Sequence, residues 1–206
     1  MKILVTGKNG QVGHELMKTL APLGKVVGVD LKECDLSQSA AIDALLERVK
    51  PDIIVNPAAY TEVDKAESEP TIAHAVNAQA PKVFARYAAR HNIPLIHFST
   101  DYVFDGSKAD PYLEDDEANS KSVYGKTKWL GEEAVRKMAA KHIIIRTSWV
   151  FGSHGVNFLK TMLKLASERD KLSVVSDQFG APTSARMLAE ATAQIIKEFG
   201  TFFMFG

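Results

Sequence analysis

Two kinds of hydrophobic pattern alternate along the chain. Short runs rich in β-branched and other apolar residues predict buried strands, at residues 3–5, 26–29, 53–55, 95–98 and 143–145. Between them, apolar residues recur with helical spacing, as in Val12, Leu16 and Leu20, and predict helices, the later ones at 38–49, 71–91, 124–140, 156–169 and 184–198. This alternation predicts an α/β, Rossmann-like fold, a doubly wound parallel sheet with helices on both faces.

Local signals refine this pattern at a few positions. Ser37 is a plausible N-cap for the helix at 38–49 and Pro51 stops that helix, while Pro81 predicts a kink within 71–91. A β-like run at 172–175 predicts a further strand. The aromatic run at 201–205 also reads as a strand, which needs a sheet partner. Either it pairs with existing structure or the chain is truncated, and we favour truncation.

Composition and charge exclude several classes of protein. Hydrophobic residues make up 46% of the 206 residues and charged residues 24%, as in ordinary globular domains. The 25 Lys and Arg balance the 25 Asp and Glu, so no charge surplus points to nucleic acid or an anionic membrane. The single cysteine, Cys34, excludes an internal disulfide and a cysteine metal site. We expect a soluble, cytoplasmic protein without a metal.

A glycine-rich loop directly follows the first predicted strand and opens the first helix. Its spacing is G-x-x-G-x-x-G, which suits a tight turn, a close backbone approach to a pyrophosphate and close helix–strand packing. The free N–H groups and the dipole of the helix N-terminus favour an anion there. The loop therefore predicts a dinucleotide site, with the cofactor-binding residues Gly7, Asn9, Gly10, Gln11, Val12 and Gly13.

The second predicted strand ends in an acidic residue, Asp30, about twenty residues after the loop, where an acid binds a ribose 2′-hydroxyl. This favours NAD, but Lys8 and Lys32 are near enough to meet a 2′-phosphate. Asp35 and Leu36 are expected to flank the adenine. The choice between NAD and NADP stays open.

A Tyr-x-x-x-Lys pair, Tyr124 and Lys128, lies on a predicted helix, where the i, i+4 spacing puts both side chains on one face. A nearby ammonium stabilises a phenolate and lowers the pKa of the tyrosine, so the pair can act as a general acid or base. Thr100 ends the fourth strand, at the edge of the sheet where ligands bind. Its hydroxyl can hold a carbonyl oxygen beside the tyrosine.

Together these motifs resemble the extended short-chain dehydrogenase/reductase superfamily and, within it, the dTDP-4-dehydrorhamnose reductase family. The resemblance extends to about residue 198, and the stretches that carry it are 7–13, 55–67, 99–106, 124–128, 146–151 and 177–183. It implies NAD(P)H-dependent reduction of the C4 ketone of a dTDP-6-deoxy-4-keto-hexose, dTDP-4-dehydrorhamnose to dTDP-rhamnose, in nucleotide-sugar biosynthesis. It also implies a dinucleotide-binding domain at 1–150 and an incomplete substrate domain at 151–206.

The resemblance also implies roles for individual residues. The catalytic trio is Thr100, Tyr124 and Lys128, and Lys128 also holds the nicotinamide ribose. The other cofactor contacts are Ala58, Ala59 and Tyr60 after the third strand, with Asn77 in support. The residues near the sugar nucleotide are Val63, Thr100, Tyr102 and Trp149. For Trp149 a core-packing role is equally open, and for Val63 it is favoured.

Two other kinds of function stay open, a different reaction on a sugar nucleotide and a non-catalytic role. One is a sugar-nucleotide epimerase or dehydratase; in the related dehydratases an Asp-Glu pair follows the threonine, whereas here Asp101-Tyr102 follows. Another is a cofactor-binding regulatory subunit, like the one related to this family that partners methionine adenosyltransferase. The intact Thr100, Tyr124 and Lys128 favour an enzyme. A homodimer is left open.

Overall fold

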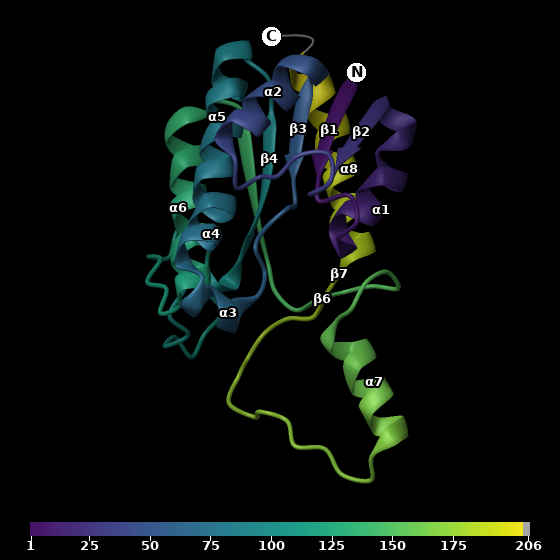
Figure 1. Cartoon of the computed structure of the whole chain (residues 1–206), viewed down its shortest axis with the longest axis vertical. Helices are drawn as coiled ribbons and strands as arrows, with labels where there is room; N and C mark the ends of the chain where they lie inside the picture. Colours follow the sequence, from purple (N-terminus) through teal and green to yellow (C-terminus); the bar gives the residue numbers. More distant parts are fainter. Residues whose placement is uncertain (204–206) are drawn as a thin grey trace.

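A parallel sheet with the strand order β2-β1-β3-β4-β5 forms the centre of the computed structural model (Figure 1). The structure describes residues 1–203, with side chains up to residue 198. The strands are β1 (Lys2–Thr6), β2 (Lys25–Val29), β3 (Ile53–Asn56), β4 (Leu95–Thr100) and β5 (His142–Thr147). All of the predicted strands of this sheet are thereby confirmed.

Helices cover both faces of the sheet, as the pattern predicts. One face carries α1 (Gln11–Thr19) and α8 (Ala185–Phe203), and the other carries α2 (Ser39–Val49), α5 (Ala80–His91) and α6 (Val123–Met138) (Figure 1). The alternating side chains of strand β1 show why both faces of the sheet must be covered. Ile3 and Val5 are buried under α1 and α8, whereas Leu4 between them is buried under the opposite helices.

The order of the strands reverses between β1 and β3, which places a crevice at their carboxyl ends. The glycine loop follows β1 at this point, and the segment 57–62 follows β3. The fold thus brings two stretches that are fifty residues apart to the two walls of one crevice.

The helix predicted at 71–91 is interrupted rather than simply kinked. It consists of α4 (Pro70–His74), a π-helical turn η2 (Ala75–Gln79) and α5, and a short helix α3 (Val63–Ser68) precedes it. Pro81 has no N–H to donate to the carbonyl of Asn77. That carbonyl faces Gly131 of α6, where a Cβ atom would collide with it. The π turn therefore lets α6 approach closely.

The chain after β5 differs from the predictions. Strands β6 (Val150–Phe151) and β7 (Thr183–Ser184) pair in parallel, and the helix α7 (Phe158–Glu168) between them stands away from the sheet (Figure 1). The predicted strand at 172–175 is wrong, because this segment is exposed and has no strand beside it with which to pair. The strand expected at 201–205 is wrong for 201–203, where α8 continues, and 204–206 lie outside the described residues.

Helix α8 packs on the sheet although it follows residue 150. Leu188, Ala189 and Ala193 are buried against α1 and the strands, and Thr19 donates a hydrogen bond from Oγ1 to the Ala189 carbonyl. Residues on both sides of position 150 therefore share this core, and the division into two domains at that position stays a prediction. Among residues 1–203, no helix combines the length and the apolar character needed to cross a bilayer.

Phe84→Ala is expected to lower the free energy of unfolding by about 3–5 kcal/mol, because Phe84 is the largest fully buried side chain and truncation leaves a cavity. Urea denaturation measures the change. Leu130→Ala is the control, since Leu130 is 47% exposed and its truncation is expected to cost about 0.5 kcal/mol or less. Equal losses in the two variants would contradict the assignment of the core.

Candidate active site

The glycine loop is built for a close approach of backbone and ligand. Gly7 has a φ of 60°, a conformation that suits glycine, and its carbonyl accepts the N–H of Gly10 at 3.0 Å. A Cβ atom on Gly13 would collide with the Gly7 carbonyl, so glycine there lets α1 begin directly behind the loop. The first amides of α1 therefore face the crevice without intrahelical partners.

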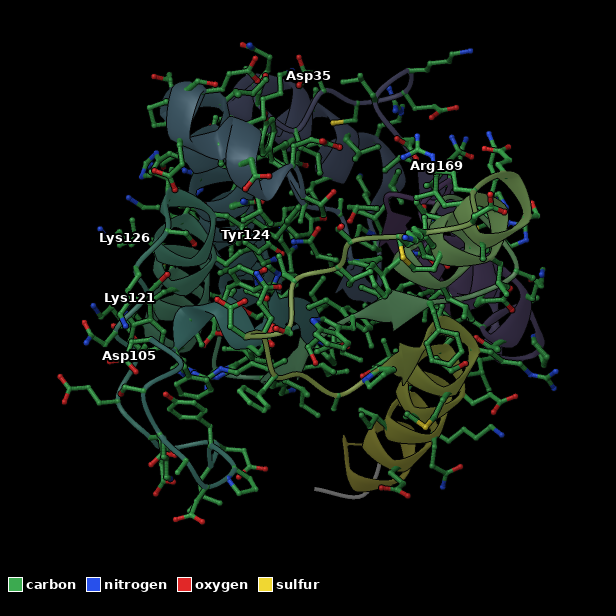
Figure 2. All side chains as sticks on the ribbon, turned by 90° about the horizontal axis from the view of Figure 1, so that it is seen from below. Asp35, Asp105, Lys121, Tyr124, Lys126 and Arg169 are labelled. Atoms are coloured by element: carbon green, nitrogen blue, oxygen red, sulfur yellow. The ribbon has the colours of Figure 1, made fainter. Side chains whose placement is uncertain are left out.

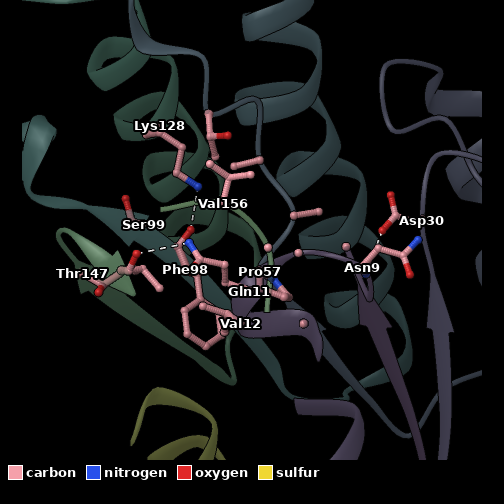
Figure 3. Close-up of a pocket in the computed structure, with 18 of the residues that line it drawn as sticks. Asn9, Gln11, Val12, Asp30, Pro57, Phe98, Ser99, Lys128, Thr147 and Val156 are labelled. Atoms are coloured by element: carbon pink, nitrogen blue, oxygen red, sulfur yellow. Dashed lines mark hydrogen bonds between the residues drawn. The ribbon is translucent and has the colours of Figure 1, made fainter. Parts of the chain in front are cut away.

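A cleft of about 510 Å³ runs from this loop across the crevice to α6 (Figure 3). Most of the residues predicted to bind cofactor line it, namely Gly7, Asn9, Gly10, Gln11, Val12, Gly13, Asp30, Ala58, Ala59, Tyr124 and Lys128. Asp30 lies at one end and Lys128 at the other (Figure 3). The cleft therefore has the anion-binding helix N-terminus between an acidic end and a cationic end.

Asp30 is held by the loop that it borders. Its Oδ2 accepts the backbone N–H of Asn9 at 2.9 Å, and its own N–H donates to Glu33, which pairs with Lys8 at 2.6 Å. Lys8 is thus engaged by Glu33 in this structure. Asp35 and Leu36 do not line the cleft: Asp35 caps the N–H of Ser37, and Leu36 packs against the core under α2. The structure does not bring these two to the predicted adenine site.

Tyr124 and Lys128 lie on one face of α6, as their spacing predicts. Ser122 caps this helix by accepting the N–H of Gly125, and both side chains are buried, with exposed fractions of 9% and 2%. Tyr124 points to the interior, whereas Lys126 points outward (Figure 2). The Lys128 ammonium donates to the Phe98 carbonyl at 2.6 Å (Figure 3). The helix therefore delivers a phenol and an ammonium to the end of β4.

Thr100 lies beside the phenol but lines neither of the two cavities described here. Its Oγ1 accepts the N–H of Tyr102 at 3.2 Å and donates to Asp101 at 3.1 Å. The ring of Tyr102 meets that of Tyr124 edge to face at 5.6 Å. The hydroxyl is thus fixed next to Tyr124 by the turn that follows β4.

The ionisation of the pair differs from the expectation. Burial raises the pKa of Tyr124 to about 12, assisted by the negative charge of Asp101 and offset in part by the Thr100 hydroxyl. The expected lowering by Lys128 does not appear, because the ammonium is directed to the Phe98 carbonyl. Burial also lowers the pKa of Lys128 to about 8, and Glu132 opposes this effect. At neutral pH the phenol is protonated and the lysine is cationic.

The segment after β3 is held by a buried asparagine. Asn77 Oδ1 accepts the N–H of Tyr60 at 2.8 Å, and its Nδ2 donates to the Tyr60 carbonyl and to Thr127 of α6. Asn77 supports the site, as expected, but does not line the cleft. Tyr60 also lies outside it, because its hydroxyl donates to Glu69 at 2.7 Å. Ala58 and Ala59 alone of this group face the cleft.

A second cavity of about 950 Å³ lies on the other side of Tyr102. Two residues expected near a sugar nucleotide, Tyr102 and Trp149, line it, together with Phe104 and Phe179. Trp149 is 43% exposed, which argues against a purely core role, and a Cβ on Gly180 would collide with its indole. Val63 packs instead against the small buried cluster of Ala66, Ala73 and Tyr124 and lines neither cavity.

Several residues of the site were not predicted from the sequence, some because they carry no clear signal and others although a signal exists. Val156 and Gly155 line the cleft from the loop after β6, which Gln11 anchors by accepting a hydrogen bond from Asn157 at 3.0 Å. Thr147 could have been found as the end of the strand beside β4. Glu132 could have been found as the residue four positions after Lys128.

The residues of the cleft fit a dinucleotide. The glycines leave room that a Cβ would fill, and the buried Oγ1 of Thr147, which lines the cleft, has no hydrogen-bond partner among the described residues. A crevice at the strand switch, a G-x-x-G-x-x-G turn and a Tyr–Lys pair beside a threonine define a dinucleotide-binding domain of the short-chain dehydrogenase/reductase type.

Comparison with known proteins narrows this class. Residues 1–201 match the model of the RmlD substrate binding domain, and the chain belongs to this family. It is 48% identical over 201 residues to the dTDP-4-dehydrorhamnose reductase of Shigella flexneri, an alignment that covers 96% of this chain and 67% of the relative. The chain therefore spans about two thirds of the length of this relative.

Solved structures agree with this assignment. A dTDP-4-dehydrorhamnose reductase of Clostridium acetobutylicum superposes with a TM-score of 0.92 at 42% identity, covering 96% of this chain and 71% of that one. The reductase of Bacillus anthracis, solved in complex with NADP, superposes with a TM-score of 0.90 at 36% identity, covering 95% and 70%. The predicted family and fold are thereby confirmed.

Gly13→Ala is expected to weaken NADPH binding at least tenfold, because the new methyl group collides with the Gly7 carbonyl and displaces the loop from the start of α1. Fluorescence titration with NADPH measures the affinity. Gly152→Ala is the matched control, since its Cβ would meet no backbone atom, only the Ala185 methyl group at 3.3 Å and Gln11 Oε1 at 3.9 Å, and Gly152 does not line the cleft. Unchanged affinity in Gly13→Ala would refute the assignment of this loop.

Proposed function

We propose that the chain carries the cofactor site and catalytic groups of an NAD(P)H-dependent reductase. Its substrate is the C4 ketone of a dTDP-6-deoxy-4-keto-hexose, and the product is a dTDP-6-deoxyhexose of the dTDP-rhamnose type. The observation that carries the proposal is a buried phenol and a buried ammonium on one face of α6, at the end of the cleft that the glycine loop lines. Relatives at 43–49% identity named dTDP-4-dehydrorhamnose reductase support the substrate.

Tyr124 is the proton donor in this proposal. Reduction of a ketone places negative charge on the carbonyl oxygen, which must receive a proton. Because burial keeps the pKa of Tyr124 near 12, the phenol carries its proton at neutral pH and can donate it. The bound nicotinamide supplies the hydride. The phenol acts as an acid in this direction, and the protonated form is the one that this role requires.

Thr100 acts on the ketone oxygen, and Lys128 acts on the cofactor. The Thr100 hydroxyl accepts the Tyr102 N–H and donates to Asp101 in this structure, and it would turn its proton to the ketone oxygen as charge develops there. The Lys128 ammonium, which donates to the Phe98 carbonyl, would hold the nicotinamide ribose when the cofactor is bound. In this proposal Thr100 therefore stabilises the negative charge that develops on the ketone oxygen, and Lys128 positions the cofactor.

The second cavity suits the nucleotide sugar. Tyr102 lies between it and Tyr124, and the exposed rings of Trp149 and Phe179 offer faces on which a base or sugar can stack. Tyr102 stands where the related dehydratases have a second acid, so this site lacks the group that elimination needs. A homodimer and a cytoplasmic location remain predictions from the sequence.

Tyr124→Phe is expected to reduce NADPH oxidation with dTDP-4-dehydrorhamnose about a hundredfold or more, because the proton donor is lost. NADPH affinity is expected to stay within about twofold, since the ring remains. Absorbance at the nicotinamide band measures the rate, and fluorescence titration measures affinity. Tyr87→Phe is the control: the same hydroxyl is removed from a buried tyrosine under α2, away from both cavities.

Net consumption of NADPH separates a reductase from an epimerase, which returns its hydride. If the wild-type chain binds NADPH but consumes none, the regulatory alternative is supported and the proposed activity fails. If Tyr124→Phe turns over like the wild type, Tyr124 has no part in the chemistry.

A further inference from the structure

Glu132 is a fully buried carboxylate on α6, with an exposed fraction of 0%. Charged groups are costly to bury unless they are paired, so such a residue needs a reason. It follows Lys128 by four positions and therefore lies on the same helix face, one turn further along. The catalytic roles proposed above leave it unused.

Two arginines hold this carboxylate. Arg146 on β5 donates from Nε to Oε1 at 3.0 Å and from Nη2 to Oε2 at 2.8 Å, and Arg136 donates to Oε2 at 2.6 Å. Burial acts to raise the pKa of Glu132, but Arg146, Ser99 and Arg136 together outweigh this effect, and the pKa lies below its ordinary value. Glu132 is therefore negatively charged near neutral pH.

The other titratable groups near Lys128 are His97, Tyr124, Asp101 and Arg146. His97 on β4 stays neutral, because burial and Lys128 itself lower its pKa well below the usual range. Tyr124 is protonated, and burial raises the pKa of Asp101, which interacts with Thr100 and Tyr124. Arg146 faces Glu132. Among the described residues, Glu132 is the charged group that opposes the effect of burial on Lys128.

Arg146 connects the same carboxylate to the substrate cavity. Its Nη1 donates to the Glu114 carbonyl at 3.1 Å, and its guanidinium lies 4.9 Å from the centre of the Phe104 ring. Phe104 lines the second cavity. The guanidinium of Arg146 thus connects α6, β5 and the loop after β4.

We propose that Glu132 is a positioning residue that keeps Lys128 in its ammonium form, and that Arg146 fixes both Glu132 and the Phe104 wall of the substrate cavity. The catalytic meaning of this pair rests on the proposed function, but the coupling between Glu132 and Lys128 does not. It can be measured without cofactor, substrate or turnover.

The test is the titration of Lys128 in the whole chain, followed by NMR of ¹³C-labelled lysine and assigned with Lys128→Met. In Glu132→Gln the midpoint is expected to fall by about one pH unit, because an opposite charge nearby is removed. Glu133→Gln is the matched control: the same change at the next position affects a carboxylate paired at the surface with Arg136 and Lys137. Its midpoint is expected to equal that of the wild type.

An unchanged midpoint in folded Glu132→Gln would overturn the proposal. If that variant does not fold, Glu132→Asp keeps the charge but moves it one carbon away, and a midpoint lowered by a few tenths of a unit is expected. A midpoint equal to or above that of the wild type overturns the proposal in that case.

Turnover is measured separately. The alkaline limb of kcat/KM is expected to move down with the Lys128 midpoint in Glu132→Gln and to stay in place in Glu133→Gln. Arg146→Lys is expected to raise the KM for the nucleotide sugar severalfold with the limb unmoved, and a moved limb contradicts the role given to Arg146. Absence of turnover in the wild-type chain would contradict the proposed function. The NMR titration would still test whether Glu132 affects the pKa of Lys128.

Discussion

The buried ammonium of Lys128 is the constraint on which the site depends. A cation removed from water is unfavourable unless hydrogen bonds and an opposite charge replace its hydration. The Phe98 carbonyl supplies one hydrogen bond at 2.6 Å, and Glu132 supplies the charge. The position of α6 against β4 is therefore fixed by chemistry as well as by packing, because any withdrawal of the helix would separate the ammonium from the strand end.

Close packing around α6 makes this position attainable. Gly125 and Gly131 have no room for a Cβ atom, since Tyr102 and Asn77 present backbone carbonyls to them. The carbonyl of Asn77 lies there because Pro81 cannot donate to it, and the π turn carries the asparagine side chain toward the segment after β3. One irregularity in a helix thus positions the wall of the cleft and admits the catalytic helix.

Local patterns were sufficient for the sheet, the glycine loop and the common face of Tyr124 and Lys128, because each depends on a short spacing. They failed where the outcome depends on long-range packing. The run at 172–175 has strand-like residues but no neighbouring strand, and Leu36 is drawn into the core rather than to the adenine site. The sign of the pKa change at Tyr124 required its burial, which no spacing reveals.

Burial acts in opposite directions on the two groups of the site. It disfavours every charged form, so it keeps the Tyr124 phenol protonated and at the same time favours loss of the proton from Lys128. Reduction needs the protonated phenol and the charged lysine together. Burial in a pocket without water favours the protonated phenol but not the charged lysine. A fixed negative charge that reaches Lys128 without reaching the phenol supplies the second, and Glu132, one helical turn beyond Lys128 and two beyond Tyr124, has that placement.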